Sequence, residues 1–250
     1  MTMNFRYNTV CVTHAGLVRS VNEDAFLDRG EVGLWAVADG MGGHENGRWA
    51  STAVVAALGE AALEGDLDAD TKRIADAIHA ANATIQAAAE TAGRRMGSTV
   101  VALRICGVHF QCYWAGDSRI YLLRGGQLVQ LTRDHTQVED MVERGLLTRA
   151  EAWRHPMSHV LSRAVGVEPE LQLDAVVDVV EPRDLFLLCS DGLTGFVSEA
   201  ELSERLDHLD PRTACKHLLE LVLSRGASDN LTMVAVLCEE ATMLSDQVEA

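Results

Sequence analysis

The stretch Leu34-Trp35-Ala36-Val37-Ala38-Asp39-Gly40-Met41-Gly42-Gly43-His44 joins an apolar run of strand length to one carboxylate and three glycines. We interpret residues 33–38 as a strand that leads Asp39 into a glycine-rich loop. Because glycine has no Cβ, such a loop lets backbone carbonyl groups and a ligand approach each other closely. Taken alone, Asp39 fits an ordinary tight turn equally well.

Three further aspartates share this setting. Asp117 and Asp191 follow apolar runs and Asp229 precedes one, and each adjoins Gly, Ser or Asn. The strand ends of antiparallel sheets can meet at one rim, where four carboxylates do not all ionise comfortably without cations. Oxygen ligands without a Cys or His cluster favour Mg²⁺ or Mn²⁺ over Zn²⁺. The pattern therefore predicts a divalent-cation site.

Such a site suits phosphoryl chemistry. Two cations about 3.5–4 Å apart can bridge a water, lower its pKa and stabilise an in-line displacement at phosphorus. A phosphorylated substrate also needs a positive group beside the cations. Arg19, close to the acidic pair Glu23-Asp24, is the candidate for that group.

Length and composition describe an ordinary globular protein. The 250 residues are 48% hydrophobic and 23% charged, so we expect a single domain over residues 1–240 and a polar tail over 241–250. The net charge of −16 argues against a nucleic-acid or anionic-membrane surface. No apolar run reaches the roughly 20 residues of a membrane span, and the first residues lack a signal-peptide profile. We expect a cytoplasmic monomer.

The six cysteines show no C-x-x-C spacing and lie mostly in apolar runs, which predicts buried thiols rather than disulfides or a zinc site.

The order of apolar and polar segments predicts strands separated by pairs of helices. Gly125-Gly126 is a strong hairpin signal, so the middle of the chain reads as an antiparallel meander. We expect strands at 8–15, 25–27, 33–38, 98–106, 109–115, 119–123, 127–131, 184–189 and 231–237, with apolar segments at 160–165 and 171–180. We expect helices at 49–63, 70–92, 134–144, 148–153, 199–208 and 211–225.

With these residues in hand, the chain resembles a metal-dependent serine/threonine protein phosphatase of the type 2C (PPM) family, in its bacterial stand-alone form. The matching stretches occur in family order from residue 19 to 236, which is nearly the whole chain. They are Arg19-x-x-Asn22-Glu23-Asp24-x-Phe26, VADGMGGH (37–44), Gly97-Ser98-Thr99, AGDSRIY (115–121), LTRDHT (131–136), LSRAVG (161–166), CSDGL (189–193) and SDNLT (228–232). Each stretch is weak alone, and the ordered set is specific.

The resemblance implies an α+β fold, a four-layer αββα sandwich of two antiparallel β-sheets flanked by helix pairs. It places the metals in a cleft at one end and a mobile flap, residues 136–159, beside that cleft. It also implies that Asp39 bridges two metals and holds the attacking water, with the Gly40 carbonyl completing one metal shell. The other implied roles are Asp191 and Asp229 on the first metal, Asp117 with Asp191 on a weaker third, Glu23 and Asp24 through metal-bound waters, and Arg19 on the substrate phosphate.

One position departs from part of the family. Some eukaryotic relatives place a histidine, proposed as the general acid, directly after the Asp-Gly pair, where this chain has Met41. A thioether cannot donate a proton. We interpret His44 as a loop-ordering residue, and we place His135, His155 and His159 on the surface or in the flap rather than in catalysis.

The leading hypothesis is hydrolysis of phosphoserine and phosphothreonine in proteins, with Mn²⁺ or Mg²⁺ as cofactor and the targets of a serine/threonine kinase as substrates. The main alternative is a catalytically silent regulatory module with the same fold, whose usual signature is the loss of the metal-binding aspartates. A nucleotide or nucleic-acid hydrolase is a third possibility, which the acidic charge disfavours.

Overall fold

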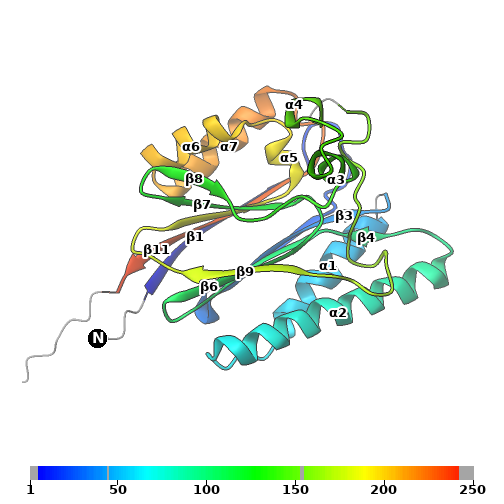
Figure 1. Cartoon of the computed structure of the whole chain (residues 1–250), viewed down its shortest axis with the longest axis horizontal. Coiled ribbons are helices and arrows are strands. Elements are labelled where there is room, and N and C mark those ends of the chain that lie inside the picture. The colour runs from blue at the N-terminus through cyan, green and yellow to red at the C-terminus, as the bar shows by residue number, and fades with distance from the viewer. Residues whose placement is uncertain (1–4, 44, 153–154, 242–250) are drawn as a thin grey trace, which may run out of the picture.

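Two antiparallel sheets face each other in the computed structural model, which describes residues 5–43, 45–152 and 155–241 (Figure 1). The first sheet has the order β1 (Phe5–His14), β11 (Leu231–Glu240), β10 (Leu185–Cys189), β7 (Arg119–Arg124) and β8 (Gln127–Gln130). The second has the order β2 (Asp24–Arg29), β3 (Leu34–Met41), β5 (Val100–Cys106), β6 (His109–Ala115) and β9 (Asp174–Val179), and the short β4 (Gly97–Ser98) also pairs with β3.

Helices form the two outer layers. The helices α1 (Glu45–Glu60) and α2 (Leu67–Ala92) cover the second sheet, and α6 (Glu199–His208) and α7 (Pro211–Ser224) cover the first. The shorter elements are η1 (Gly30–Val32), α3 (Gln137–Glu143), α4 (Arg149–Ala152) and α5 (Asp191–Thr194). The predicted four-layer αββα sandwich is therefore confirmed, and α3–α5 gather at the end opposite the N-terminus (Figure 1).

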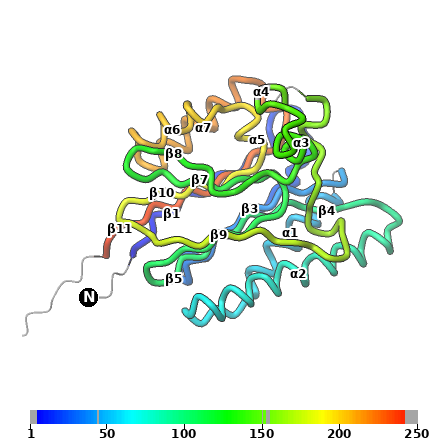
Figure 2. The backbone as a smooth tube through the Cα atoms, viewed as in Figure 1, coloured from blue at the N-terminus to red at the C-terminus, as the bar shows by residue number. Residues whose placement is uncertain are grey.

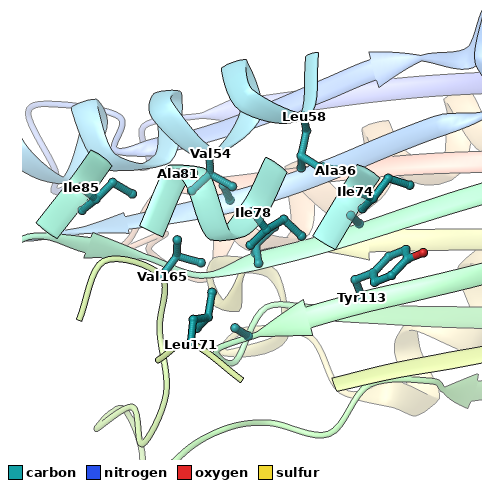
Figure 3. Close-up of a cluster of buried hydrophobic side chains, with 14 of the residues drawn as sticks. Ala36, Val54, Leu58, Ile74, Ile78, Ala81, Ile85, Tyr113, Val165 and Leu171 are labelled. Atoms are coloured by element: carbon teal, nitrogen blue, oxygen red, sulfur yellow. The ribbon is translucent and has the colours of Figure 1, made fainter. Parts of the chain in front are cut away.

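Strand periodicity explains why β3 is apolar throughout. Successive side chains point to opposite faces of a sheet. Ala36 faces α1 and α2 together with Val54 and Ile78, as Figure 3 shows. Trp35 instead packs into the core between the two sheets. A strand buried on both faces needs hydrophobic residues at every position.

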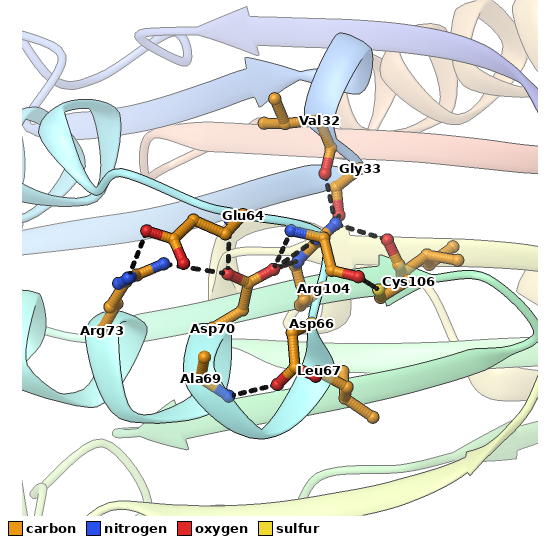
Figure 4. Close-up of polar contacts among 12 residues, drawn as sticks. Val32, Gly33, Glu64, Asp66, Leu67, Ala69, Asp70, Arg73, Arg104 and Cys106 are labelled. Carbon is orange, nitrogen blue, oxygen red and sulfur yellow. Dashed lines mark hydrogen bonds and ion pairs between the residues drawn. The ribbon is translucent and has the colours of Figure 1, made fainter.

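A buried ion pair ties the start of α2 to the second sheet. Arg104 on β5 donates from Nη2 to Oδ2 of Asp70 on α2 at 2.6 Å, and both side chains are buried (Figure 4). The backbone N–H groups of Glu64 and Gly65 also donate to Asp70. Arg104 further donates to the carbonyl oxygens of Val32 and Ile105. The pair therefore joins three separate segments of the chain.

Some element predictions need correction. β3 does not end at residue 38 but runs on to Met41, because β2 and β4 continue to pair with it. The middle of the chain is not one meander, since β5 and β6 lie in the second sheet and β7 and β8 in the first. Residues 160–165 form isolated bridges and no strand. Trp153, His44 and the tail beyond Ala241 lie outside the described residues.

All six cysteines are free thiols and four of them are buried, as predicted. Among the described residues, no helix is both long and apolar enough to cross a membrane.

Candidate metal centre

Two carboxylates face each other across neighbouring strands. Asp24, the first residue of β2, pairs directly with Asp39 on β3. Cβ atoms of directly opposed residues lie about 4.5–5.5 Å apart, and like charges in this position repel. Asp24 is buried, and its Oδ2 accepts a hydrogen bond from Ser190 at 2.8 Å. This pairing explains why β3 remains a strand through its aspartate and brings together two acids that lie fifteen residues apart in the sequence.

The backbone of Asp39 is held by the segment that links β4 to β5. Thr99 donates its N–H to the Asp39 carbonyl oxygen at 2.8 Å and accepts the Asp39 N–H on its hydroxyl at 2.9 Å. The Ser98 hydroxyl donates to the same carbonyl oxygen at 3.0 Å. Thr99 also shares a hydrogen bond of 2.7 Å with Ser118, next to Asp117. These contacts fix the position of Asp39 before any ligand binds.

Gly40 has a packing reason to be glycine. A Cβ at this position would lie 2.0 Å from the carbonyl oxygen of Gly47 on α1 and 2.6 Å from that of Glu23. The Gly40 N–H donates to the Glu23 carbonyl oxygen at 3.1 Å. Close backbone approach therefore explains this glycine without a ligand, and the role of its carbonyl group toward a cation stays a prediction.

Asp191 and Asp229 enter from the first sheet. Asp191 is the first residue of α5, directly after β10, and Asp229 lies just before β11. Oδ2 of Asp229 accepts from Arg19 at 2.8 Å, and its Oδ1 accepts the N–H of Asn230 at 2.8 Å. Oδ2 of Asp191 lies 3.8 Å from Nδ1 of His159 at the end of the flap. Both acids thus have partners within the chain.

Asn230 is a residue whose role the sequence analysis missed. Its Oδ1 accepts the N–H of Glu23 at 2.8 Å, and its Nδ2 donates to the carbonyl oxygens of Ala15 and Val21. Ser190 likewise accepts the N–H of Thr232 at 2.9 Å while it donates to Asp24. Asn and Ser are common at strand ends, so only contacts with residues distant in the chain distinguish these two.

Asn230→Ala is expected to lower the free energy of unfolding by about 2 kcal/mol, because the buried N–H and carbonyl groups it serves lose their partners. Activity in saturating Mn²⁺ is expected to fall about tenfold, since the segment that carries Glu23 loses its side-chain anchor. Urea unfolding and initial rates measure the two effects. Asn230→Asp, which keeps the acceptor for the Glu23 N–H, is expected to retain more stability and more activity than Asn230→Ala. Equal losses in the two variants would contradict this role.

Asp117 lies in the connection that carries the chain from β6 to β7. His135 clamps this connection, since its N–H donates to the Gly116 carbonyl oxygen at 2.9 Å and its Nδ1 accepts the Gly116 N–H at 3.2 Å. His135 is only 3% exposed and stacks on Trp114. Our placement of His135 on the surface or in the flap was therefore wrong in respect of exposure, because the base of the flap folds back onto β6.

Burial and mutual repulsion raise the pKa values of the clustered acids. Burial raises the pKa of Asp39 well above its ordinary value, and the charges of the four other aspartates raise it further. Burial also raises the pKa of Asp24 to about 7, against hydrogen bonds from Ser190 and Thr232 that lower it. For Asp117, burial and then Asp191 raise the pKa to about 7. These carboxylates resist joint ionisation unless positive charge joins them.

The donor set fits a hard divalent cation. Oδ1 of Asp24 is buried and accepts no hydrogen bond from the described residues, and a buried acceptor of this kind calls for a partner. The surrounding donors are carboxylate oxygens, which suit Mg²⁺ or Mn²⁺. Within the described ranges no three of these side chains already form a ligand group. Asp229 is turned to Arg19 and Asp191 to His159.

An open cleft collects the predicted site residues. Its volume is about 1650 Å³, larger than the roughly 300–1,000 Å³ of typical small-molecule sites. The lining residues include Arg19, Glu23, Asp39, Gly40, Met41, Asp117, Asp191 and Asp229. Asp24 lies beneath them rather than on the lining. A cleft of this size suits part of a polypeptide.

A family model described as Protein phosphatase 2C matches residues 17–232. The chain belongs to the protein phosphatase 2C family. It is 38% identical to the serine/threonine protein phosphatase PstP of Mycobacterium tuberculosis over 227 residues, which cover 88% of this chain and 42% of that relative. It therefore spans less than half of PstP.

A second relative of this phosphatase 2C chain is similar over most of its length. The serine/threonine phosphatase stp of Listeria innocua is 34% identical over 236 residues, 90% of this chain and 93% of the relative. The solved catalytic domain of PstP, in complex with two manganese ions, has a TM-score of 0.85 at 34% identity and covers 95% of this chain and 100% of that one. The phosphatase 2C fold and the metal dependence of its family agree with the resemblance stated from sequence.

Proposed function

We propose that this chain is a protein serine/threonine phosphatase that hydrolyses phosphoserine and phosphothreonine monoesters with the aid of two divalent cations. Four aspartates from both sheets converge on one large cleft, with Asp24 buried beneath them, and this convergence carries the proposal. Family membership supports it, and the relatives named as serine/threonine phosphatases support the substrate class. The two manganese ions in the PstP structure support Mn²⁺ as a suitable cation.

The proposed ligands follow from the site. Asp39 would bridge two cations, with the Gly40 carbonyl on one of them and Asp191 and Asp229 on the other. Glu23 and Asp24 would act through ordered water. Asp117 and Asp191 would serve a weaker third site. The cations supply Lewis acidity toward the phosphoryl oxygens and lower the pKa of the water that they bind.

Arg19 would bind the substrate phosphate. In the described part of the chain its guanidinium group uses only Nη2, on Asp229, so donors remain for phosphate oxygens. The side chain is 52% exposed at the edge of the cleft. Met41 has no proton to give, so the leaving seryl or threonyl oxygen would take its proton from water in the open cleft.

Hydrolysis of p-nitrophenyl phosphate and of a phosphothreonine peptide tests the proposal. Both are expected to proceed in Mn²⁺ and to stop with a chelator, whereas ATP and DNA should turn over far more slowly. Turnover that persists after chelation would contradict the metal role. No observation on the described residues favours the catalytically silent alternative, because all the aspartates that such modules lose are present.

Mn²⁺ is also expected to stabilise the protein independently of activity. A cation that binds only the folded state adds RT ln(1 + [L]/Kd), about 2.7 kcal/mol at one hundred times the Kd. Thermal unfolding followed against Mn²⁺ concentration measures this gain. Asp191→Asn should lose most of it, and Asp76→Asn on the exposed face of α2 should keep all of it. A midpoint that does not respond to Mn²⁺ would contradict the site.

A further inference from the structure

The cleft continues beyond the aspartates to the connection between α2 and β4, where Arg94 and Arg95 line it. Both side chains are exposed. The other arginines on its lining each form an ion pair, Arg19 with Asp229 and Arg163 with Asp174. Among the described residues, no carboxylate lies within ion-pair distance of Arg94 or Arg95. In this part of the chain, these two are the cleft arginines that form no ion pair.

The backbone that carries the arginine pair packs against the backbone that follows Asp39. Met41 on β3 pairs with Gly97 on β4, so the chain leaving Asp39 runs antiparallel to the chain arriving from Arg95. Gly42 has a φ of +131°, and a Cβ there would lie 2.8 Å from the Arg95 carbonyl oxygen. Backbone packing therefore holds the two segments together. Figure 1 shows α2 ending at the same end of the sandwich as α3–α5.

The register also limits the distance between Arg95 and the backbone of Asp39. Thr99, whose N–H bonds to the Asp39 carbonyl oxygen, follows Arg95 by four residues. At about 3.3 Å per residue, four residues span at most about 13 Å. An extended peptide with its phosphate at the aspartates would bring a residue up to about four positions away beside Arg94 and Arg95.

Charge indicates what would bind there. Carboxylates match the fork of guanidinium donors, and arginine is the residue best suited to such pairing. Glu90 and Glu168 also line this wall and oppose acidic ligands, but within the described chain neither forms an ion pair with the arginines. The chain as a whole carries a charge of −16 and would repel an acidic peptide elsewhere on its surface.

We infer that Arg94 and Arg95 form a subsite for acidic side chains three to four residues from the phosphorylated residue of a protein substrate. The inference rests on the proposed phosphatase function and defines its substrate class more narrowly. It makes the α2–β4 connection a determinant of substrate choice in addition to the flap.

Matched phosphothreonine peptides test the subsite. One pair carries Glu or Gln at the third and fourth positions before the phosphothreonine, and a second pair carries them after it. In the wild-type protein, kcat/KM is expected to favour Glu over Gln about five- to tenfold on one of the two sides, as two partly exposed ion pairs allow. The double variant Arg94→Gln, Arg95→Gln should reduce that ratio to about one.

A charge-matched control separates local pairing from net charge. Arg6→Gln, Arg212→Gln removes two exposed arginines that lie outside the cleft and should leave the Glu preference unchanged. Charge reversal by Arg94→Glu, Arg95→Glu should favour Lys-containing peptides. Hydrolysis of p-nitrophenyl phosphate, which has no flanking residues, should be unchanged in the Arg6→Gln, Arg212→Gln control. The Glu-to-Gln ratio is taken within each variant, so a change in basal rate does not affect it.

The outcomes distinguish failure of the subsite from failure of the proposed function. If the wild-type protein hydrolyses p-nitrophenyl phosphate but shows no Glu preference on either side, the subsite is overturned and the proposed function stands. A preference that survives in the Arg94, Arg95 double variant overturns the subsite equally. If the aryl phosphate is not hydrolysed at all, the proposed function fails and the subsite fails with it.

Discussion

Replacement of Asp39 by asparagine is expected to lower kcat/KM for p-nitrophenyl phosphate in Mn²⁺ by more than about 10³-fold. Asp39 is the proposed bridge between two cations, and an amide cannot supply the negative charge that both would share. Its backbone contacts with Thr99 and Ser98 do not involve the carboxylate. The variant should therefore fold with the same circular dichroism spectrum.

The same substitution should have the opposite effect on stability in a chelator. Burial and four neighbouring aspartates raise the pKa of Asp39 well above its ordinary value. Its ionisation therefore disfavours the folded state, and this penalty grows as the pH rises from the ordinary aspartate pKa towards the raised folded pKa. The Asp39→Asn variant carries no such charge, so its free energy of unfolding near neutral pH in a chelator should be about 1–2 kcal/mol higher.

Asp76→Asn is the control for both measurements, because Asp76 is exposed on α2 and outside the cleft. It should change neither activity nor stability beyond about 0.5 kcal/mol. Wild-type activity in the Asp39→Asn protein would remove the basis for the proposed centre. A loss of activity together with a loss of structure would assign Asp39 a structural role instead.

Arg104→Met is expected to lower the free energy of unfolding by about 3–5 kcal/mol. The change removes the nearer guanidinium partner of the buried Asp70 carboxylate. The N–H groups of Glu64 and Gly65 still donate to it, and Arg73 stays 3.8 Å away. Neither Asp70 nor Arg104 lines the cleft. The kcat per folded molecule should therefore stay unchanged, in contrast to Asp39→Asn.

A double-mutant cycle measures the interaction free energy between Asp70 and Arg104. Asp70→Asn combined with Arg104→Met should cost less than the sum of the two single changes, because the double variant leaves no buried charge unpaired. The exposed pair Lys216–Glu220 on α7 is the matched control, and Lys216→Met should cost less than about 1 kcal/mol. If Arg104→Met lowers the free energy of unfolding by less than about 1 kcal/mol, water must reach the Asp70 carboxylate in that variant.

The pH dependence of stability in acid should also report the Asp70–Arg104 pair. Burial alone would raise the pKa of Asp70, but hydrogen bonds from Arg104 and from the backbone N–H groups of Glu64 and Gly65 outweigh it and lower the pKa. The resulting stability is complete above the ordinary pKa of an unfolded aspartate and is lost as the pH falls through the lower folded value. Asp70→Asn should weaken the pH dependence in that acidic range.

The features that could be predicted are those that depend on residues close together in the sequence. Period-two alternation, glycine pairs and helix start signals act over a few residues, so most strands and helices were predicted within a few positions. Asp39, Asp117, Asp191 and Asp229 were selected from sequence because each stands next to glycine, serine or asparagine at a strand end, and all four line one cleft. Their exact roles as ligands stay predictions.

The missed features depend on residues far apart in the chain. Asn230 contacts Glu23 across 207 positions, and nothing around Asn230 indicates that partner. β3 extends through Asp39 because Asp24 on β2 and the segment from β4 to Thr99 pair with it. The change of sheet after β6 follows from the packing of β7 against β10, which local sequence does not encode. His135 was misplaced for the same reason, since its partner Gly116 lies 19 positions earlier.

The position of β11 has a consequence for biosynthesis. This strand does not lie at an edge but between β1 and β10, and it pairs with β1 from Phe5↔Glu240 to His14↔Leu231 (Figure 2). Sequence separation of this size makes folding slow and leaves strand edges open in the nascent chain. Asp229 also arrives only with this strand. A ribosome-bound chain therefore has no complete cleft until β11 has left the exit tunnel, so the segments that emerge earlier cannot form the proposed metal centre on their own.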